Sequence, residues 1–232
     1  MGLEGVDRRG AAPDREVSHP GYLELGPKRR LLTRGFVARA SPRVAADLLG
    51  KLLVRDEADG STTSARLVET EAYREDDPAS HSHRGRTERN AVMFGRAGHL
   101  YVYFTYGAHH CMNVSCEQEG FGSAVLLRAA VVLQGHGPVR ARRGAQHPDR
   151  DLLRGPGRLS AGLAVDRSFD GIDLFDPNSP LRLEDDGWRP DPGAVVSGPR
   201  VGIRVAVDTP WRYWLEGVPE VSRYVRHPAA AR

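Results

Sequence analysis

The segment SAVLLRAAVVL, residues 123 to 133, constrains the fold of this 232-residue chain more than any other. Apart from Ser123 and Arg128 it is entirely apolar, which predicts a strand that packs into a core. Burying an arginine without a partner costs free energy, because its charge loses water. We therefore expect a carboxylate or an ordered polar site beside Arg128, and Glu71 is the natural candidate.

That carboxylate lies in a second predicted strand, TSARLVETEAY, at residues 63 to 73. The period of two places Glu69, Glu71 and Tyr73 on the same face. A carboxylate on the inner face would lose water and act as a general base. Solvated charges are the alternative, since glutamates are mostly exposed. Because both side chains point the same way, their spacing does not show whether Glu69 or Glu71 is the general base.

The other predicted elements are mainly strands. A helix begins at Ser41 and Pro42 and ends at Gly50. Further strands are predicted at 51–55, 100–105 and 111–116. The segments PLRLE, VGIRVAV and WRYWLEG are predicted to form strands or extended pieces, and short helices are predicted around GPG. Strands outnumber helices without alternating regularly, which predicts a largely antiparallel α+β domain. We expect tails at 1–30 and 227–232 around one domain at 31–226.

Composition narrows the class of protein. No apolar run approaches the roughly 20 residues of a membrane-spanning helix, and the first 30 residues lack the apolar core of a signal peptide. Two cysteines do not build a disulfide framework, so we expect a soluble cytoplasmic protein. The net charge is +3, but the bases are two lysines and 31 arginines. Arginine suits phosphate, so nucleic acid is a possible partner.

The stretch LYVYFTYGAHHCMNVSC, residues 100 to 116, concentrates aromatic side chains. Tyr101 and Tyr103 share one face of a strand, where aromatics are more often core than a stacking surface. Tyr106 precedes Gly107 and is predicted to project at a turn. An exposed aromatic there fits a wedge or a stacking surface for nucleobases.

The same stretch holds the candidates for a metal site. His109, His110, Cys111 and Cys116 would alternate across both faces of a strand, which scatters the ligands. The paired signature of zinc deaminases is also missing. We therefore expect no metal and no cofactor.

Two further features bear on chemistry. Lys51 and Lys28 lie away from the Glu and Tyr cluster, so a DNA-processing enzyme of this sequence would use water rather than an amine nucleophile. The long polar loop at 74–98 carries Arg84, Arg86 and Arg89, which are solvated by default.

Taken in order, these residues resemble the alkyladenine (3-methyladenine) DNA glycosylase family. The matching segments span roughly residues 33 to 225, and they are LLGKLLV, LVETEAY, DPASHSHRGRTERNAVMF, LYVYFTYG, CMNVS, VLLRA, GPGRLSAGLAVD and PWRYW. The resemblance implies one domain with a curved, open-barrel-like antiparallel sheet and surrounding helices. It implies an enzyme that flips an alkylated or deaminated purine out of double-stranded DNA and hydrolyses its N-glycosidic bond.

The resemblance also implies roles for individual residues. Glu71 matches the general base, and Arg128 helps hold the catalytic water. Tyr73, His81, Tyr103 and Asn113 line the base pocket, Tyr106 intercalates, and Arg84, Arg86 and Arg89 are candidates for the DNA backbone. We expect a monomer, without membrane association, near the bacterial nucleoid.

The chain departs from the family pattern at Glu88, Ala108 and His110, which bear on DNA affinity and substrate breadth. Two other functions stay open at this point. One is a nucleic-acid binding module without activity, and the other is a zinc-dependent hydrolase built on the His and Cys cluster.

Overall fold

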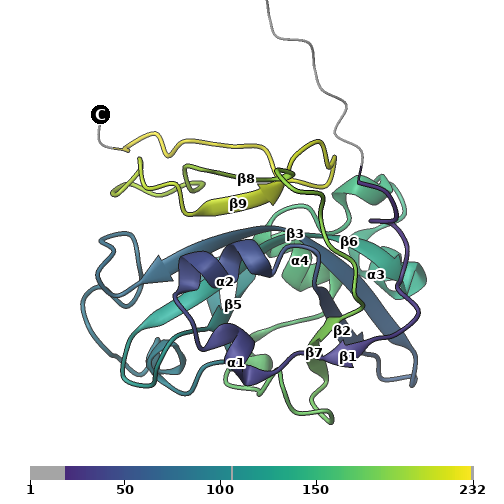
Figure 1. Ribbon diagram of the computed structural model, residues 1–232, viewed down its shortest axis with the longest axis horizontal. Helices are drawn as coiled ribbons and strands as arrows, with labels where there is room; N and C mark the ends of the chain where they lie inside the picture. The colour runs from purple at the N-terminus through teal and green to yellow at the C-terminus, as the bar shows by residue number, and fades with distance from the viewer. Residues whose placement is uncertain (1–18, 106, 231–232) are drawn as a thin grey trace, which may run out of the picture.

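Two long neighbouring strands, β3 (Thr62–Arg74) and β6 (Ser123–Gln134), run antiparallel through the centre of the sheet (Figure 1). They belong to a computed structural model that describes residues 19–105 and 107–230. From Thr63 to Ala72 every residue of β3 is buried, because both faces of the strand are covered. The apolar run around Arg128 is thus a buried strand, as predicted.

Seven strands complete a nine-stranded sheet in the order β1-β7-β2-β3-β6-β5-β4, with β9 paired to β3 and β8. They are β1 (Arg30–Leu31), β2 (Leu52–Asp56), β4 (Leu100–Thr105), β5 (His109–Ser115), β7 (Leu181–Asp185), β8 (Val195–Gly198) and β9 (Arg212–Leu215). Every pairing is antiparallel, and within the described residues the sheet does not close into a barrel. The predicted α+β class is confirmed.

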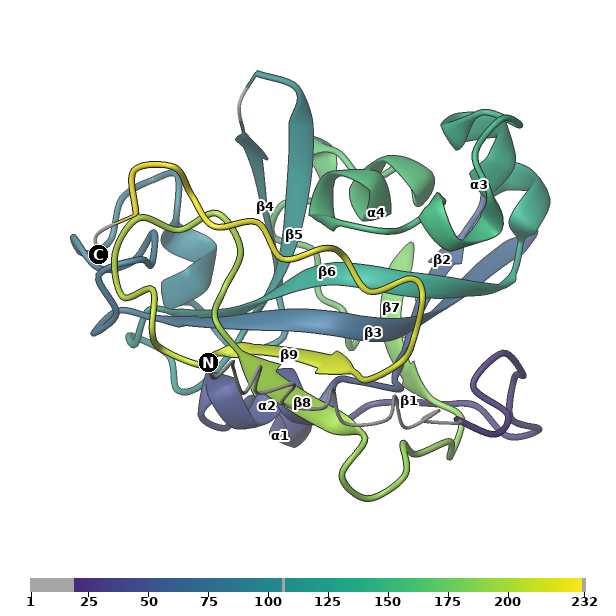
Figure 2. The same cartoon turned by 90° about the horizontal axis from the view of Figure 1, so that it is seen from above.

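Helices cover the sheet from both sides. They are α1 (Arg34–Val37), α2 (Ser41–Asp47), α3 (His136–Arg143) and α4 (Pro156–Gly162), with 3-10 turns η1 (Ala91–Phe94), η2 (Asp149–Asp151) and η3 (Arg167–Phe169). Figure 2 shows α3 and α4 on one side of β3 and β6, and α1 and α2 on the other. It also shows the hairpin of β4 and β5 standing out beyond α4. Among the described residues, no helix has the length and apolar character to cross a membrane.

A β-bulge in β3 changes the partner of the strand. Residues 62–66 pair with β2, whereas Glu69, Thr70 and Glu71 pair with β9. The register shifts on both sides of Glu69, between Leu67 and Thr70. Bulges re-aim side chains and bend the strand. Glu69 and Glu71 therefore lie in the part of β3 that pairs with β9 instead of β2.

One predicted strand is wrong. Residues 201–207, VGIRVAV, form turns and bends. Gly202 and Ala206 have φ angles of 71° and 50°, which a strand does not accommodate. The amide of Val201 donates to the Glu71 side chain and that of Gly202 to Val225. The residue pattern also predicts none of β1, α1, α3 and β8.

Residues that the sequence places in the N-terminal tail contact the domain. The buried guanidinium of Arg66 donates to the backbone oxygens of Tyr22 and Glu24, at 3.0 and 2.6 Å. It also binds Asp186 through two hydrogen bonds of 3.1 and 2.8 Å. Residues 22–24 are thus held by the side chain of a sheet residue. The domain limits at 31 and 226 stay a prediction.

Arg66→Ala should lower the free energy of unfolding by about 3–5 kcal/mol, because it leaves the buried Asp186 carboxylate unpaired. Urea denaturation followed by circular dichroism measures the change. Arg43→Ala is the matched control: that side chain is exposed beside Asp47, and such pairs contribute about 0–1 kcal/mol. Equal losses in the two variants would contradict this account of Arg66.

Candidate active site

A cavity of about 1030 Å³ opens against the strands β3 to β6. It is lined by the six residues to which the resemblance gives catalytic or base-pocket roles, namely Glu71, Tyr73, His81, Tyr103, Asn113 and Arg128. They come from β3, the loop after it, β4, β5 and β6. The fold thus brings together side chains from four strands and a loop. The volume is at the upper end of the range for small-molecule sites, and the lining mixes aromatic and charged groups.

Glu71 is fully buried from bulk solvent at one wall of this cavity. Its Oε1 accepts a hydrogen bond of 2.7 Å from the amide of Val201. Its Oε2 accepts one of 2.8 Å from the hydroxyl of Tyr73 and lies 3.3 Å from Nη1 of Arg128. These three donors fix the carboxylate in one orientation. The sequence analysis missed Val201, whose backbone contact leaves no mark in the residue pattern.

Glu69 points to the same guanidinium but does not line the cavity. It accepts hydrogen bonds of 2.8 Å from Nε of Arg128 and Nε of Arg212. The amide and the hydroxyl of Ser222 supply two more, at 2.7 and 2.8 Å. Burial by itself would raise the pKa of Glu69, but the charges of Arg128 and Arg212 outweigh it and hold the pKa below its ordinary value.

Arg128 lies between the two carboxylates. Glu71, the predicted partner, is one of them, and Glu69 makes the closer contact. Burial would lower the pKa of Arg128, but Glu71 and Glu69 raise it above the ordinary value. The guanidinium is therefore a permanent cation, with one edge bound to Glu69 and Nη1 directed at Glu71.

Aromatic rings form another wall. The rings of Tyr101 and Tyr103 lie 5.6 Å apart at 31°, and His81 meets Tyr103 edge-on at 4.6 Å. Nδ1 of His81 lies 3.2 Å from the hydroxyl of Tyr101. His81 is itself exposed to solvent, and partial loss of water, with Arg89 second, lowers its pKa, which favours the neutral ring at pH 7. Tyr101, expected only as core, is buried yet also lines the cavity.

The remaining predicted site residues differ in burial and in their contacts. Asn113 is buried opposite Tyr101 in the β4–β5 pairing, and its side-chain amide donates to the Tyr101 carbonyl at 3.1 Å. Arg84, Arg86 and Arg89 are exposed. Burial raises the pKa of Tyr101, and the charge of Arg89 opposes this rise. Tyr106 lies outside the described residues. Within the part of the chain that the structure covers, no three His, Cys, Asp or Glu side chains gather as a metal site would require.

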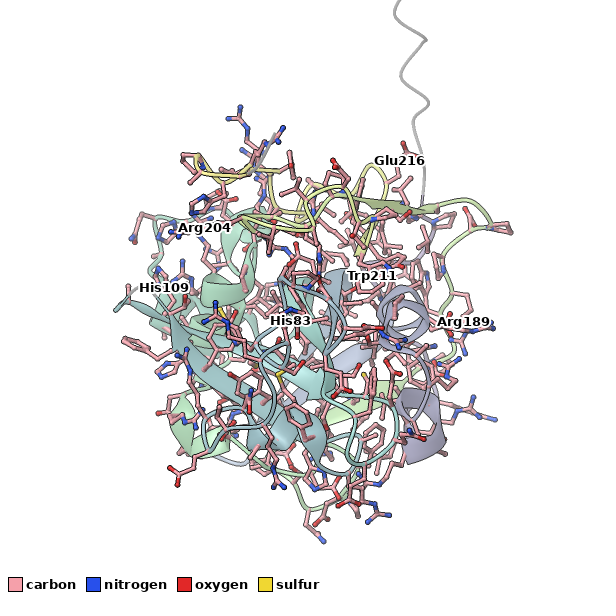
Figure 3. The ribbon with its side chains drawn as sticks, turned by 90° about the vertical axis from the view of Figure 1, so that its left-hand side faces the viewer. His83, His109, Arg189, Arg204, Trp211 and Glu216 are labelled. Carbon is pink, nitrogen blue, oxygen red and sulfur yellow. The ribbon has the colours of Figure 1, made fainter. Side chains whose placement is uncertain are left out.

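Arginines that the sequence analysis missed surround the mouth of the cavity. They are Arg143 at the end of α3, Arg154 and Arg158 around the start of α4, and Arg223 in the C-terminal segment. Figure 3 shows Arg204 and His109 toward the same side of the molecule, the first from the C-terminal segment and the second from β5. The clustering of arginine around GPG, in RDLLRGPGR, was the available signal.

Comparison with known proteins defines the class. Residues 35–219 match the family model for methylpurine-DNA glycosylase. The chain therefore belongs to this family, whose members are hydrolases that cleave the N-glycosidic bonds of damaged bases in DNA.

Similar bacterial proteins cover most of the chain. A protein of Streptomyces avermitilis named "putative 3-methyladenine DNA glycosylase" is 47% identical over 209 residues, which is 89% of this chain and 97% of that protein. Proteins of the same name from Burkholderia lata and Nocardia farcinica are 46% and 48% identical. The matched regions are 87% and 82% of this chain, and 94% and 89% of the two relatives, respectively.

The low pKa of Glu69 predicts a pH dependence of stability. Its contribution is fully present above the unfolded pKa, about 4.3, and is lost as pH falls through the lower folded pKa. At pH 7, Glu69→Gln should cost about 3–5 kcal/mol, since Arg128 and Arg212 lose their shared anion. The difference from wild type should shrink in urea titrations carried from pH 7 to pH 3. Glu216→Gln, at an exposed position labelled in Figure 3, is the control. A difference that is constant over this range would contradict the charge assignment.

Proposed function

We propose that this protein is a monofunctional glycosylase that flips alkylated or deaminated purines out of double-stranded DNA. It releases each base by hydrolysis of the N-glycosidic bond, with water as the nucleophile. The observation that carries the proposal is the setting of Glu71: a buried carboxylate, held by three donors, at the wall of an aromatic-lined cavity. A base in a duplex is out of reach at its sugar bond, so the nucleotide must leave the stack.

The cavity wall supplies the groups that a flipped purine needs. Stacking on an aromatic ring contributes about 1–3 kcal/mol per base, which offsets part of the cost of unstacking. Tyr73 and Tyr103 are the rings that we assign to this task, with neutral His81 edge-on to Tyr103. We assign to Asn113 the exclusion of guanine, through contact with its 2-amino group. The intercalating role of Tyr106 rests on the sequence alone.

Glu71 would act as the general base. A water between its carboxylate and the sugar gives one proton to Glu71 while its oxygen bonds to the anomeric carbon. The N-glycosidic bond breaks, and its electron pair leaves with the purine. The anionic carboxylate also stabilises positive character on the sugar as the base departs. Arg128 would orient the water beside this carboxylate. Among the described residues that line the cavity there is no lysine, which favours water over an amine nucleophile.

Glu71→Gln should lower the rate of base release by about 100-fold or more, while lesion binding stays close to wild type. The assay uses duplex oligonucleotides with hypoxanthine, ethenoadenine or 3-methyladenine, in the presence of a chelator, followed by alkaline cleavage of abasic sites. Glu75→Gln, a carboxylate just past the end of β3 and outside the cavity, is the matched control. A fully active Glu71→Gln enzyme would remove Glu71 from this role. Wild-type protein inactive on all three lesions would overturn the proposed function.

The arginines at the cavity mouth are proposed to contact DNA phosphates. Arg158→Ala and Arg223→Ala should each weaken duplex binding for every sequence and reduce the slope of log K against log salt by about 0.9. Fluorescence anisotropy at several salt concentrations measures this slope. Arg43→Ala, on α2 across the sheet from α4, should leave it unchanged (Figure 2). An unchanged slope in both mouth variants would place the DNA elsewhere.

A further inference from the structure

Arg200 lies behind the pocket tyrosine. Its guanidinium carbon is 4.7 Å from the centre of the Tyr73 ring and 5.5 Å from that of Trp211, which is labelled in Figure 3. The Arg200 side chain is fully buried and does not line the cavity, whereas Tyr73 does. The ring therefore stands between the cavity and a buried cation.

Three contacts hold this guanidinium in place. Nη2 donates to Oδ1 of Asp77 at 3.0 Å, and Nη1 donates to the other carboxylate oxygen. Nη1 also donates to the Ala72 carbonyl at 3.0 Å. Burial would lower the pKa of Arg200, but Asp77 and Tyr73 raise it above the ordinary value, so the group stays charged.

The buried charges next to the catalytic wall of the cavity balance one another, apart from the arginines at the mouth. Three buried guanidinium groups, on Arg128, Arg200 and Arg212, accompany three buried carboxylates, on Glu69, Glu71 and Asp77. The wall therefore offers no net negative charge to a cationic base. An aromatic face attracts a cation by about 0.5–2 kcal/mol. A fixed cation behind the ring repels a second cation that stacks on its cavity side, with little screening away from water.

We propose that Arg200 is a specificity-determining residue, whose charge behind Tyr73 shifts lesion choice toward neutral purines and away from cationic alkylated ones. This inference rests on the proposed function. Arg200 also precedes Val201 in the sequence, and the amide of Val201 donates to Glu71. The contacts of Arg200 therefore help to position the amide that holds the general base. A purely positioning role would change the excision of all lesions alike. The charge effect changes their ratio.

The test compares wild type with Asp77→Asn and with the double variant Arg200→Met, Asp77→Asn. In Asp77→Asn the cation stays but loses its counter-charge, and the asparagine oxygen retains the bond from the Ala79 amide. The double variant removes both charges, and replacing a buried pair by neutral groups is often tolerated. For each protein, kcat/KM is measured on the same duplex with 3-methyladenine, a cationic base in DNA, and with hypoxanthine, a neutral one; neither carries the 2-amino group assigned to exclusion by Asn113.

The ratio of cationic to neutral excision should be lowest in Asp77→Asn, intermediate in wild type and highest in the double variant. The two variants should differ by about 3- to 10-fold. Urea denaturation of each protein confirms folding. Equal ratios in three active proteins, or the reverse order, would overturn the role of Arg200 and leave the proposed function intact. Failure of the wild type on both lesions would instead overturn the proposed function.

Discussion

The buried carboxylate of Glu69 connects the parts of the protein that build the cavity. It accepts hydrogen bonds from Arg128 on β6, Arg212 on β9 and Ser222 in the C-terminal segment, which supplies residues at the cavity mouth. Removing one partner of a buried carboxylate is strongly destabilising, so these contacts depend on one another. Glu71 reaches Arg128 as well, yet only Glu71 lines the cavity. One carboxylate thus orients the arginine, and the other remains next to the space that a substrate would fill.

The buried arginines next to the cavity are all paired with carboxylates. Arg200 adds its charge on the far side of Tyr73. Under the proposed function, the electron-rich rings of the cavity would favour cationic purines, because an aromatic face attracts a cation. The cation behind one of these rings would oppose that preference. Lesion choice in this protein is therefore expected to reflect charges behind the wall as well as the rings that form it.

Elements with strong local signals could be predicted from the residues alone. The apolar run around Arg128, the alternation in TSARLVETEAY and the Ser41–Pro42 helix start all predicted elements that the structure contains. The need of a buried Arg128 for a carboxylate also followed from the sequence. Period-two alternation fixes the face of a side chain, and burial fixes its need for partners.

The identity of those partners depends on contacts between distant parts of the folded chain. Ser222 lies 153 residues from Glu69, Val201 lies 130 from Glu71, and Arg200 lies 123 from Asp77. Such contacts depend on how the C-terminal segment returns to β3, which no local pattern encodes. For the same reason residues 201–207 resemble a strand by composition but form turns: the amide of Val201 donates to the Glu71 carboxylate, and that of Gly202 donates to the carbonyl of Val225. Local periodicity thus determines where the strands form, and long-range hydrogen bonds determine which groups meet at the site.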